Sequence, residues 1–329
     1  MHVVIDTYGA RLSFDNGLLR IETMDEDGNM QLNEIPMLHI TSLHLFPHVR
    51  VSTNVLNYCV NSGIPVFLEN KLEVTGLLWS PRYGSIASIR KKQAIFSFST
   101  LKFELIKKIL RMKNESRHTW ITRITTRKEI KSMLVLFQKQ NMAVHILPED
   151  EKKIRAWEAA TSKKFFEIYK KLLPPSCPFE KRHHRGATDP VNALLNYGYG
   201  MLYKEVTKAV IHAGLDPYTG FFHRDQYKHP ALVYDMVEPY RFWIESIVWE
   251  FCKQNPDSGR ILEPGDQSIQ KETRRRFVEK VTVFMHTKKV VRNGKRFTPA
   301  HHIRMDMQQL ASYLQKLNYE TLFNTLRYQ

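Results

Sequence analysis

The hydrophobic pattern of this chain changes once, between residues 75 and 85, and that change constrains the fold more than any other feature. Before residue 75 the apolar residues fall in short β-like segments, separated by turn signals such as Asp15-Asn16-Gly17 and Ser62-Gly63. One short helix is expected at residues 52–60. The expected strands include His2–Asp6, Leu18–Thr23, Met37–Phe46 and Ile64–Glu69. The start of the chain therefore predicts a small β-rich domain.

After residue 85 the apolar side chains recur every three or four residues, which is the spacing of one face of an α-helix. Pro174-Pro175 ends one helix and is followed by a polar, basic loop. The expected helices are Ser85–Lys113, Thr126–Asn141, Pro148–Leu173, Val191–Ala213, Leu232–Gln254, Ser268–Met285 and His301–Leu317. We therefore expect an α+β protein, with a small β-rich domain over residues 1–80 and a larger all-α domain over residues 81–329.

The charge of the chain is divided at nearly the same place. The 329 residues carry a formal net charge of +16, but residues 1–90 hold six Lys and Arg against nine Asp and Glu, a net of −3. The rest of the chain therefore carries +19. A basic excess of this size favours a polyanionic partner, nucleic acid before acidic lipid. The alternative is a solvated basic surface without a ligand.

The composition excludes several classes of protein. With 43% hydrophobic residues the chain can build cores, so it is not wholly disordered. It has no apolar run of the ~18 residues that a membrane span needs, and its first residues lack the pattern of a secretory signal. The three cysteines, Cys59, Cys177 and Cys252, are far apart and support neither a disulfide framework nor a cysteine zinc site. We expect a soluble, cytoplasmic protein.

Four acidic or histidine residues are candidates for a metal site. Glu158 is flanked by an aromatic and small residues, and His223 ends an apolar run. Asp235 and Glu238 are three residues apart, so a helix would place both on one face. Carboxylates with a histidine suit a hard divalent cation. The spacing alone leaves other roles open, namely a surface glutamate, a histidine bonded to backbone, and a helix cap with its capping-box partner.

Three blocks in one part of the chain carry a family resemblance. They are Asn192–Val206, Ala213–His223 and Pro230–Arg241, and the segments Gly84–Gln93 and Trp157–Phe166 also look like family positions. In these residues the chain resembles the Cas1 family, the integrase of CRISPR adaptation. The resemblance extends over the whole chain and implies a β-rich domain followed by a helical domain.

The resemblance also implies roles for the four candidate residues. Glu158, His223 and Asp235 match the family's catalytic, metal-binding residues and would coordinate one Mg²⁺ or Mn²⁺. Glu238 falls where family members carry a second acidic residue near the metal. Because Glu has a longer side chain than Asp, direct ligation by Glu238 is less well supported than ligation by Asp235.

The implied reaction is metal-dependent strand transfer on double-stranded DNA. The 3′-hydroxyl of a short foreign fragment, the protospacer, would attack a phosphodiester at the boundary of the CRISPR repeat, and water in its place would give endonuclease activity. The implied partners are Cas2 and a second copy of the chain, bound through the β-rich domain. Two alternatives remain open: a non-catalytic scaffold on double-stranded DNA, and a repair nuclease acting on branched DNA.

Basic residues in the helical part of the chain are candidates for phosphate contacts. Lysine and arginine at high density follow the DNA backbone and give affinity without reading the sequence. The predicted DNA-binding residues are Lys163, Lys164, Arg274, Arg275, Arg276, Lys288, Lys289, Arg292, Lys295 and Arg296.

Overall fold

The computed structural model of the chain forms two compact units, Met1–Ala87 and Ser88–Gln329. The division predicted at residue 80 adjoins residues 81–83, which lie outside the described residues. The structure describes residues 1–329 with the exception of 26–27, 81–83, 185, 188, 225, 256–260, 263–267, 293 and 327–329. The predicted fold class is confirmed, because a β-rich first unit is followed by a mostly helical second unit.

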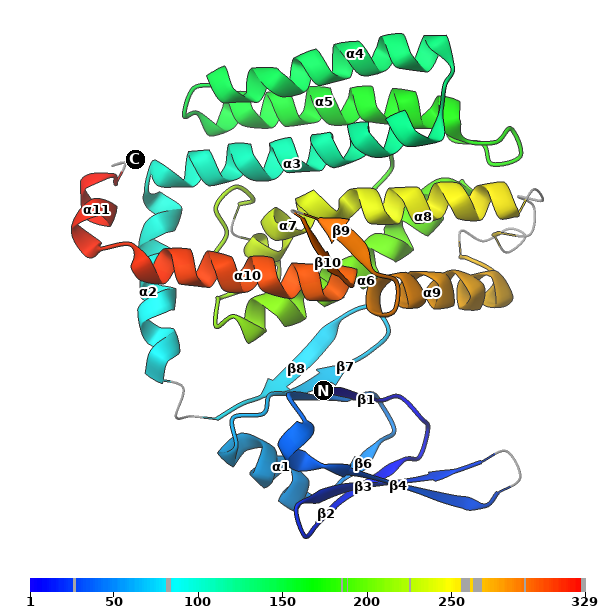
Figure 1. The fold of residues 1–329 in the computed structure, drawn as a ribbon, viewed down its shortest axis with the longest axis vertical. Coiled ribbons are helices and arrows are strands. Elements are labelled where there is room, and N and C mark those ends of the chain that lie inside the picture. Colours follow the sequence, from blue (N-terminus) through cyan, green and yellow to red (C-terminus); the bar gives the residue numbers. More distant parts are fainter. Residues whose placement is uncertain are drawn as a thin grey trace. The chain divides into compact units, whose positions relative to one another are not determined.

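The first unit contains two four-stranded sheets (Figure 1). One has the order β1 (His2–Ile5), β5 (Ser42–Leu45), β7 (Val66–Glu69) and β8 (Val74–Leu78). The other has the order β4 (Met30–Pro36), β3 (Leu18–Met24), β2 (Arg11–Asp15) and β6 (Arg50–Val51). A 3₁₀ turn, η1 (Met37–His39), and helix α1 (Thr53–Asn61) complete the unit.

The β2–β3 hairpin shows how local sequence sets this topology. Asp15 pairs with Leu18, so the loop consists of Asn16 and Gly17. Both loop residues have positive φ, 48° and 80°, which is the backbone of the tight turn that Asn-Gly favours. The turn predicted at this position is therefore present.

The two faces of the first sheet have different chemistry because successive side chains of a strand alternate. Leu43 and Leu45 of β5 belong to the hydrophobic core, which also contains residues of α1 and the second sheet. Between them, His44 belongs to a buried polar chain on the opposite face. Its Nε2 lies 2.6 Å from Ser42 Oγ and its Nδ1 lies 2.5 Å from Glu69 Oε1.

The second unit is built from α-helices of widely differing length (Figure 1). Within the described part of the chain, none of them combines the length and apolar character needed to cross a membrane. Helix α3 packs against α4, α4 against α5, and α6 against α8 and α10. The helices are α2 (Gly84–Phe98), α3 (Leu101–Ile124), α4 (Lys128–Met142), α5 (Glu151–Leu172), α6 (Pro190–His212), α7 (Ala231–Val237), α8 (Arg241–Gln254), α9 (Lys271–His286), α10 (Pro299–Lys316) and α11 (Tyr319–Asn324), with 3₁₀ turns η2 (Ala143–Ile146) and η3 (Glu238–Tyr240).

Two of the predicted helices are interrupted. The single helix predicted over Ser85–Lys113 is wrong, because α2 ends at Phe98 and α3 begins at Leu101. At the break the Thr100 amide donates to the Thr325 carbonyl at 2.8 Å, so backbone near the C-terminus replaces the helical bond. The helix predicted over Leu232–Gln254 is divided into α7, η3 and α8, where Pro239 has no amide hydrogen to donate.

A short hairpin in the second unit was not predicted. Strands β9 (Val290–Arg292) and β10 (Lys295–Phe297) pair antiparallel within the unit expected to be all-α. Each strand has only three residues, which is too short for a periodicity to show. The sequence Asn293-Gly294 between them is the signal that identifies the hairpin.

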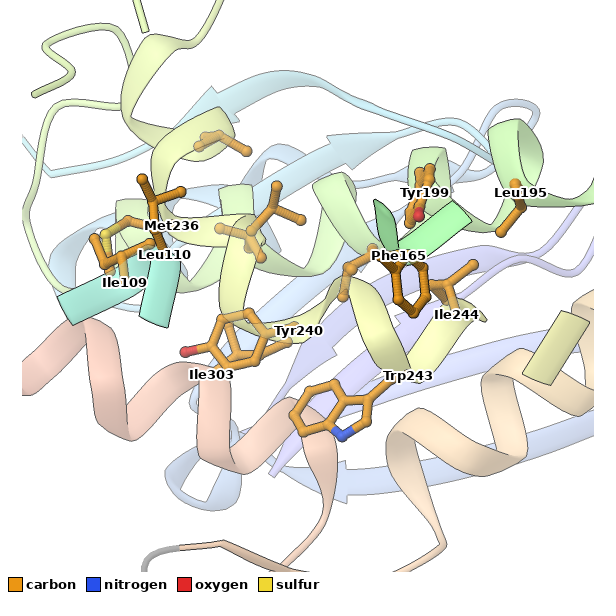
Figure 2. Close-up of a cluster of buried hydrophobic side chains, with 14 of the residues drawn as sticks. Ile109, Leu110, Phe165, Leu195, Tyr199, Met236, Tyr240, Trp243, Ile244 and Ile303 are labelled. Atoms are coloured by element: carbon orange, nitrogen blue, oxygen red, sulfur yellow. The ribbon is translucent and has the colours of Figure 1, made fainter. Parts of the chain in front are cut away.

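The core of the second unit joins helices that are far apart in sequence (Figure 2). Ile109 and Leu110 of α3, Tyr199 of α6 and Trp243 of α8 are all buried in it. The helices α6 and α8 come close together at Gly198, where a Cβ atom would lie 2.5 Å from Ile244 Cγ2. This close approach requires glycine within α6.

Gly198→Ala is expected to destabilise the protein although alanine is the better helix former. The gain in helix propensity is about 1 kcal/mol, whereas forcing a methyl group into a packed core costs about 1–3 kcal/mol and here meets a branched side chain. Urea unfolding followed by circular dichroism measures the net effect. In an Ile244→Ala background the same substitution should cost little, and equal costs in both backgrounds would contradict the packing argument.

Candidate active site

Asp235 of α7 is surrounded by hydrogen-bond donors. The side chain is 2% exposed, and its two oxygens accept from the backbone amides of Phe221 at 2.5 Å, Phe222 at 3.0 Å and His223 at 2.9 Å. His223 Nδ1 also lies 2.7 Å from Asp235 Oδ1. An ionised carboxylate only accepts, so Nδ1 of His223 holds the proton and Nε2 remains available as a ligand or acceptor.

Gly220 makes room for this arrangement. A Cβ atom at Gly220 would lie 2.7 Å from Ala231 Cβ and 3.1 Å from Asp235 Oδ2. A larger residue would therefore push the loop away from the carboxylate that binds its amides. From the other side, the Arg155 guanidinium donates to the Phe222 carbonyl and lies 4.4 Å from the centre of the Phe222 ring. The loop that carries His223 is thus held by α7 and by α5.

Lys113 of α3 binds two of the predicted metal ligands. Its Nζ donates to Glu158 Oε1 at 2.6 Å and to Glu238 Oε2 at 2.7 Å, and its side chain is 1% exposed. Ser162 Oγ also donates to Glu158 Oε1, at 2.8 Å. Three distant segments, α3, α5 and η3, therefore meet at one buried cation.

Glu238 has a cation on each of its oxygens. Arg241 Nε donates to Oε1 at 2.7 Å, and the same guanidinium donates to the Tyr203 hydroxyl at 3.0 Å. Burial raises the pKa of Glu238, but Arg241 and Lys113 outweigh it, and the net pKa lies well below the ordinary range. His223 contributes to the same lowering, which places it within electrostatic reach of Glu238. Glu238 is therefore ionised at neutral pH.

The pKa of Glu158 is set by the same opposing effects, but its side chain is less buried than that of Glu238. Its side chain is 28% exposed, whereas that of Glu238 is 7% exposed. Burial raises the pKa of Glu158, Lys113 lowers it more, and the net shift is downward although the nearby Glu238 opposes it. Both carboxylates are thus charged when the site meets a cation.

A second buried ion pair, between Arg117 and Glu245, lies one turn of α3 away from Lys113. Arg117 Nε donates to Glu245 Oε2 at 2.9 Å, and the Tyr199 hydroxyl donates to Glu245 Oε1 at 2.8 Å. The Arg117 guanidinium lies 3.9 Å from the centre of the Phe165 ring. Because these residues come from α3, α8, α6 and α5, the pair fixes the helices that carry Lys113 and Glu158.

The structure brings the four predicted residues together in two pairs. Glu158 and Glu238 share Lys113, while His223 and Asp235 share a hydrogen bond. Across the described residues, the side chains as placed form no group of three or more His, Cys, Asp or Glu that would hold a metal. The position between the two glutamates is instead taken by the Lys113 ammonium.

Two residues at the site, Lys113 and His184, were not among the predicted site residues. Lys113 lies on the buried stripe of α3, three residues after Leu110 and four before Arg117, and a lysine on such a stripe is the signal that points to it. His184 lies in the basic loop after α5. Burial and the nearby Arg182 lower the pKa of His184, so it is neutral at pH 7, and Glu158 is near enough to oppose the shift.

The predicted DNA-binding residues differ in their surroundings. Lys164 pairs with Glu167 at 3.5 Å and Arg275 with Glu272 at 3.6 Å. Arg292 pairs with Asp306 and its side chain is 13% exposed, so it is poorly placed for the backbone of a duplex that lies on the surface, and it lines a cavity instead. Arg274 is half-buried, and the exposed members of the set are Lys163, Arg275, Arg276, Lys288, Lys289, Lys295 and Arg296.

The family assignment follows from comparison with known sequences. Residues 3–282 match the family model for CRISPR associated protein Cas1. The chain belongs to the Cas1 family. It is 29% identical over 262 residues to CRISPR-associated endonuclease Cas1 1 of Thermodesulfovibrio yellowstonii, covering 77% of this chain and 80% of that protein. It is 24% identical over 322 residues to the corresponding Francisella tularensis subsp. novicida protein, covering 94% of each.

Solved structures share the fold at lower sequence identity. A casposase bound to its integration product matches this Cas1 chain with a TM-score of 0.69 and 18% identity, over all of both chains. A Cas6-RT-Cas1–Cas2 complex matches with a TM-score of 0.72 and 19% identity, over 98% of this chain and 36% of that one. A Cas1 protein from Thermotoga maritima gives 0.67 and 14%, over 96% of each. These likenesses confirm the fold.

Lys113→Met is expected to destabilise the metal-free protein by about 3–5 kcal/mol, because it leaves two ionised carboxylates facing each other without their cation. Urea unfolding in EDTA measures the loss. Lys108→Met, at an exposed position on the same helix, is the matched control and should change the free energy of unfolding by less than about 0.5 kcal/mol. Equal effects of the two variants would show that the buried ion pairs do not matter.

The stability difference between wild type and Glu238→Gln is expected to be largest near neutral pH and to shrink as the pH falls below about 4.5, the ordinary pKa of a glutamate. The folded-state pKa of Glu238 is depressed, so on acidification the unfolded chain takes up the proton first and the folded state loses its advantage. Unfolding measured in steps from about pH 7 to about pH 3 tests this. A difference that stays constant would rule out a role for the charge of Glu238.

Proposed function

We propose that this chain is a metal-dependent DNA strand transferase and endonuclease of CRISPR adaptation. The observation that carries the proposal is the pair of ionised carboxylates, the buried Glu238 and the half-buried Glu158, which share one cation within electrostatic reach of His223. Membership of the Cas1 family supports it, since the curated relatives are named as endonucleases. The casposase of similar fold was solved bound to an integration product, which supports the strand-transfer step.

The donor set fits Mg²⁺ or Mn²⁺. Glu158 and Glu238 offer hard carboxylate oxygens that already bind a cation, Lys113. His223 is within electrostatic reach of Glu238, and its Nε2 is the ring nitrogen that the bond to Asp235 leaves available. A divalent cation held by the two glutamates and His223 would stabilise negative charge on the scissile phosphate as a Lewis acid. Oxygen donors with one histidine do not favour structural zinc.

Asp235 takes a different part from the one expected from the sequence. Its two oxygens accept three backbone amides, which cannot leave unless the loop itself moves, and the His223 ring, so we assign Asp235 to positioning rather than to direct ligation. The partners of Glu238 are the side chains of Lys113 and Arg241, which can move aside for a metal ion. Asp235 holds the proton on Nδ1 of His223 and thereby leaves Nε2 available as a ligand. Glu238, whose longer side chain made direct ligation the weaker expectation, is instead the proposed ligand from η3.

The proposed reaction conserves the phosphodiester. A bond forms between the 3′ oxygen of the incoming strand and the phosphorus of the target, and the bond from that phosphorus to the 3′ oxygen of the target strand breaks. The attacking hydroxyl loses its proton and the leaving oxygen gains one. The chain's part is to hold the reacting groups, and Arg241 and Lys113 keep the ligands charged throughout.

The proposed partners are double-stranded DNA, Cas2 and a second copy of the chain. Solved structures of similar fold include a TtCas1–DNA complex and the Cas6-RT-Cas1–Cas2 complex, which supports the first two partners. The first unit is assigned the contact between copies, because its edge strand β8 leaves Leu77 and Leu78 partly exposed. The basic residues of the second unit are assigned the protospacer and the repeat, and the cytoplasm is the proposed location.

His223→Ala and Glu238→Gln are each expected to lower metal-dependent cleavage and integration by about 100-fold or more, while DNA binding in EDTA persists. The assay uses a repeat-containing plasmid, a short duplex with free 3′ ends, Cas2 and either Mg²⁺ or Mn²⁺. Asp235→Asn should cost about 10–100-fold, as expected for a residue that orients a ligand.

Glu167→Gln is the control, since it removes a surface carboxylate from the same helix as Glu158. It should retain activity. Full integration by Glu238→Gln would overturn the ligand assignment, and binding without metal-dependent cleavage by the wild type would favour the scaffold alternative.

A further inference from the structure

A cavity of about 540 Å³ lies within the helical unit, beside the acidic cluster but not part of it. Most of its lining comes from α3 and α10, and the η3 residues that line it are Pro239 and Tyr240. The preceding residue, Glu238, belongs to the candidate active site. A volume of this size suits one small molecule or one unit of a polymer, not a helix or a strand.

The lining is positively charged. Lys107, Lys108 and Arg111 of α3 and Arg292 of β9 stand against two acidic residues, Glu104 and Asp306. Both acids are already engaged, since Lys107 Nζ lies 3.2 Å from Glu104 and Arg292 pairs with Asp306. Arg111 also forms an ion pair with Glu115 at 3.4 Å, so among the described residues Lys108 is the lining cation without an acidic partner. Its charge is available to an anion.

Two donors in this lining lack an acceptor. Arg111 Nε and Arg292 Nη2 are buried and, among the described residues, neither has a hydrogen-bond partner. Arg111 Nε lies 3.4 Å from Glu115 Oε1 without forming a hydrogen bond. A buried guanidinium donor without an acceptor is unfavourable. Two such donors beside one cavity point to a ligand with several acceptor oxygens, and phosphate is the group that guanidinium recognises best.

The rest of the lining is apolar and aromatic. Tyr240 is buried between the Arg292 guanidinium, 5.0 Å from its ring centre, and the stacked Trp243 ring, 5.1 Å away. Tyr313 of α10 is 45% exposed, and the ring contact recorded for it among the described residues is an edge contact with Phe96. Tyr313 is therefore the ring that a planar ligand can stack on.

We propose that this cavity binds one nucleotide with an unpaired base, its phosphate at Arg111 and Arg292 and its base on Tyr313. A carboxylate ligand would use the cations but leave the aromatic wall unused, whereas a nucleotide uses both. The nucleotide is either a free one or one unit of a DNA strand, and the second source rests on the proposed function. Base stacking on an aromatic ring is tolerant of sequence, so little base preference is expected.

The first experiment measures equilibrium binding in EDTA, with dAMP as the free nucleotide and a labelled single-stranded oligothymidine as the strand. Tyr313→Ala is expected to weaken binding of whichever of the two probes the wild type binds, by about 5- to 100-fold. Tyr313→Phe should bind that probe as tightly as the wild type does. Arg111→Gln should weaken binding and reduce its dependence on salt by about one counterion. The controls are Tyr319→Ala, a half-exposed tyrosine on α11, and Arg123→Gln, an exposed arginine further along α3.

The second experiment locates the ligand. A 5-iododeoxyuridine placed in the oligonucleotide and irradiated should cross-link to the α10 peptide that contains Tyr313. Loss of the cross-link when dAMP is added indicates a site open to free nucleotides, and cross-linking that dAMP does not displace indicates one unit of a strand. Cross-links only to other segments, or equal binding by Tyr313→Ala and Tyr319→Ala, would overturn the proposal.

Failure of this proposal and failure of the proposed function give different results. Glu158→Gln removes a carboxylate of the active site on a helix that does not line the cavity, so it should abolish cleavage and leave the cross-link in place. A wild-type protein that cross-links at Tyr313 but shows no metal-dependent cleavage would refute the function and retain the nucleotide site.

Discussion

Two ionised carboxylates can be held together inside this protein because the Lys113 ammonium lies between them. Burying three charges costs desolvation energy that their attraction repays only in part, so this cluster is weak evidence for stability. What the cluster does is fix the positions of the segments that carry the three charges. Glu158 comes from α5, Glu238 from η3 and Lys113 from α3, and their shared ion pairs require these three segments to meet at one point.

Asp235 and Glu238 are three residues apart on the segment from α7 to η3, yet their carboxylates bind different partners. Asp235 faces the loop and accepts its amides, whereas Glu238 faces Lys113 and Arg241. On a regular helix both carboxylates would compete for one partner. Here the helix changes to a 3₁₀ turn at Glu238, next to Pro239, so the second carboxylate is directed elsewhere. The interruption that the periodicity did not predict is thus what directs the two carboxylates to different partners.

Much of the fold was predictable from the sequence, because the β-rich and helical patterns are long and the Asn16-Gly17 turn is a local signal. The site was predictable only as a set of candidates. That Glu158 lies beside Glu238 depends on tertiary packing across 80 residues, which no spacing rule can reach. Lys113 looks like an ordinary surface lysine of a helix in the sequence, and only its position on the buried stripe of α3 distinguishes it. At the helix break after Phe98 the Thr100 amide binds Thr325, a contact that is more remote still in the sequence.

The cavity and the acidic cluster share η3, and the way this turn is held decides how they would affect each other. Glu238 is fixed by two cations, and Tyr240 by a 2.6 Å hydrogen bond to Asp306 and by stacking on Trp243. Because η3 is held on both sides, it has a single conformation. A ligand in the cavity therefore has no second conformation of η3 to stabilise. Occupancy should therefore not alter the catalytic geometry. Its effect on a strand that reaches both sites would be to raise the local concentration of the reacting phosphodiester, which acts on binding rather than on the chemical step.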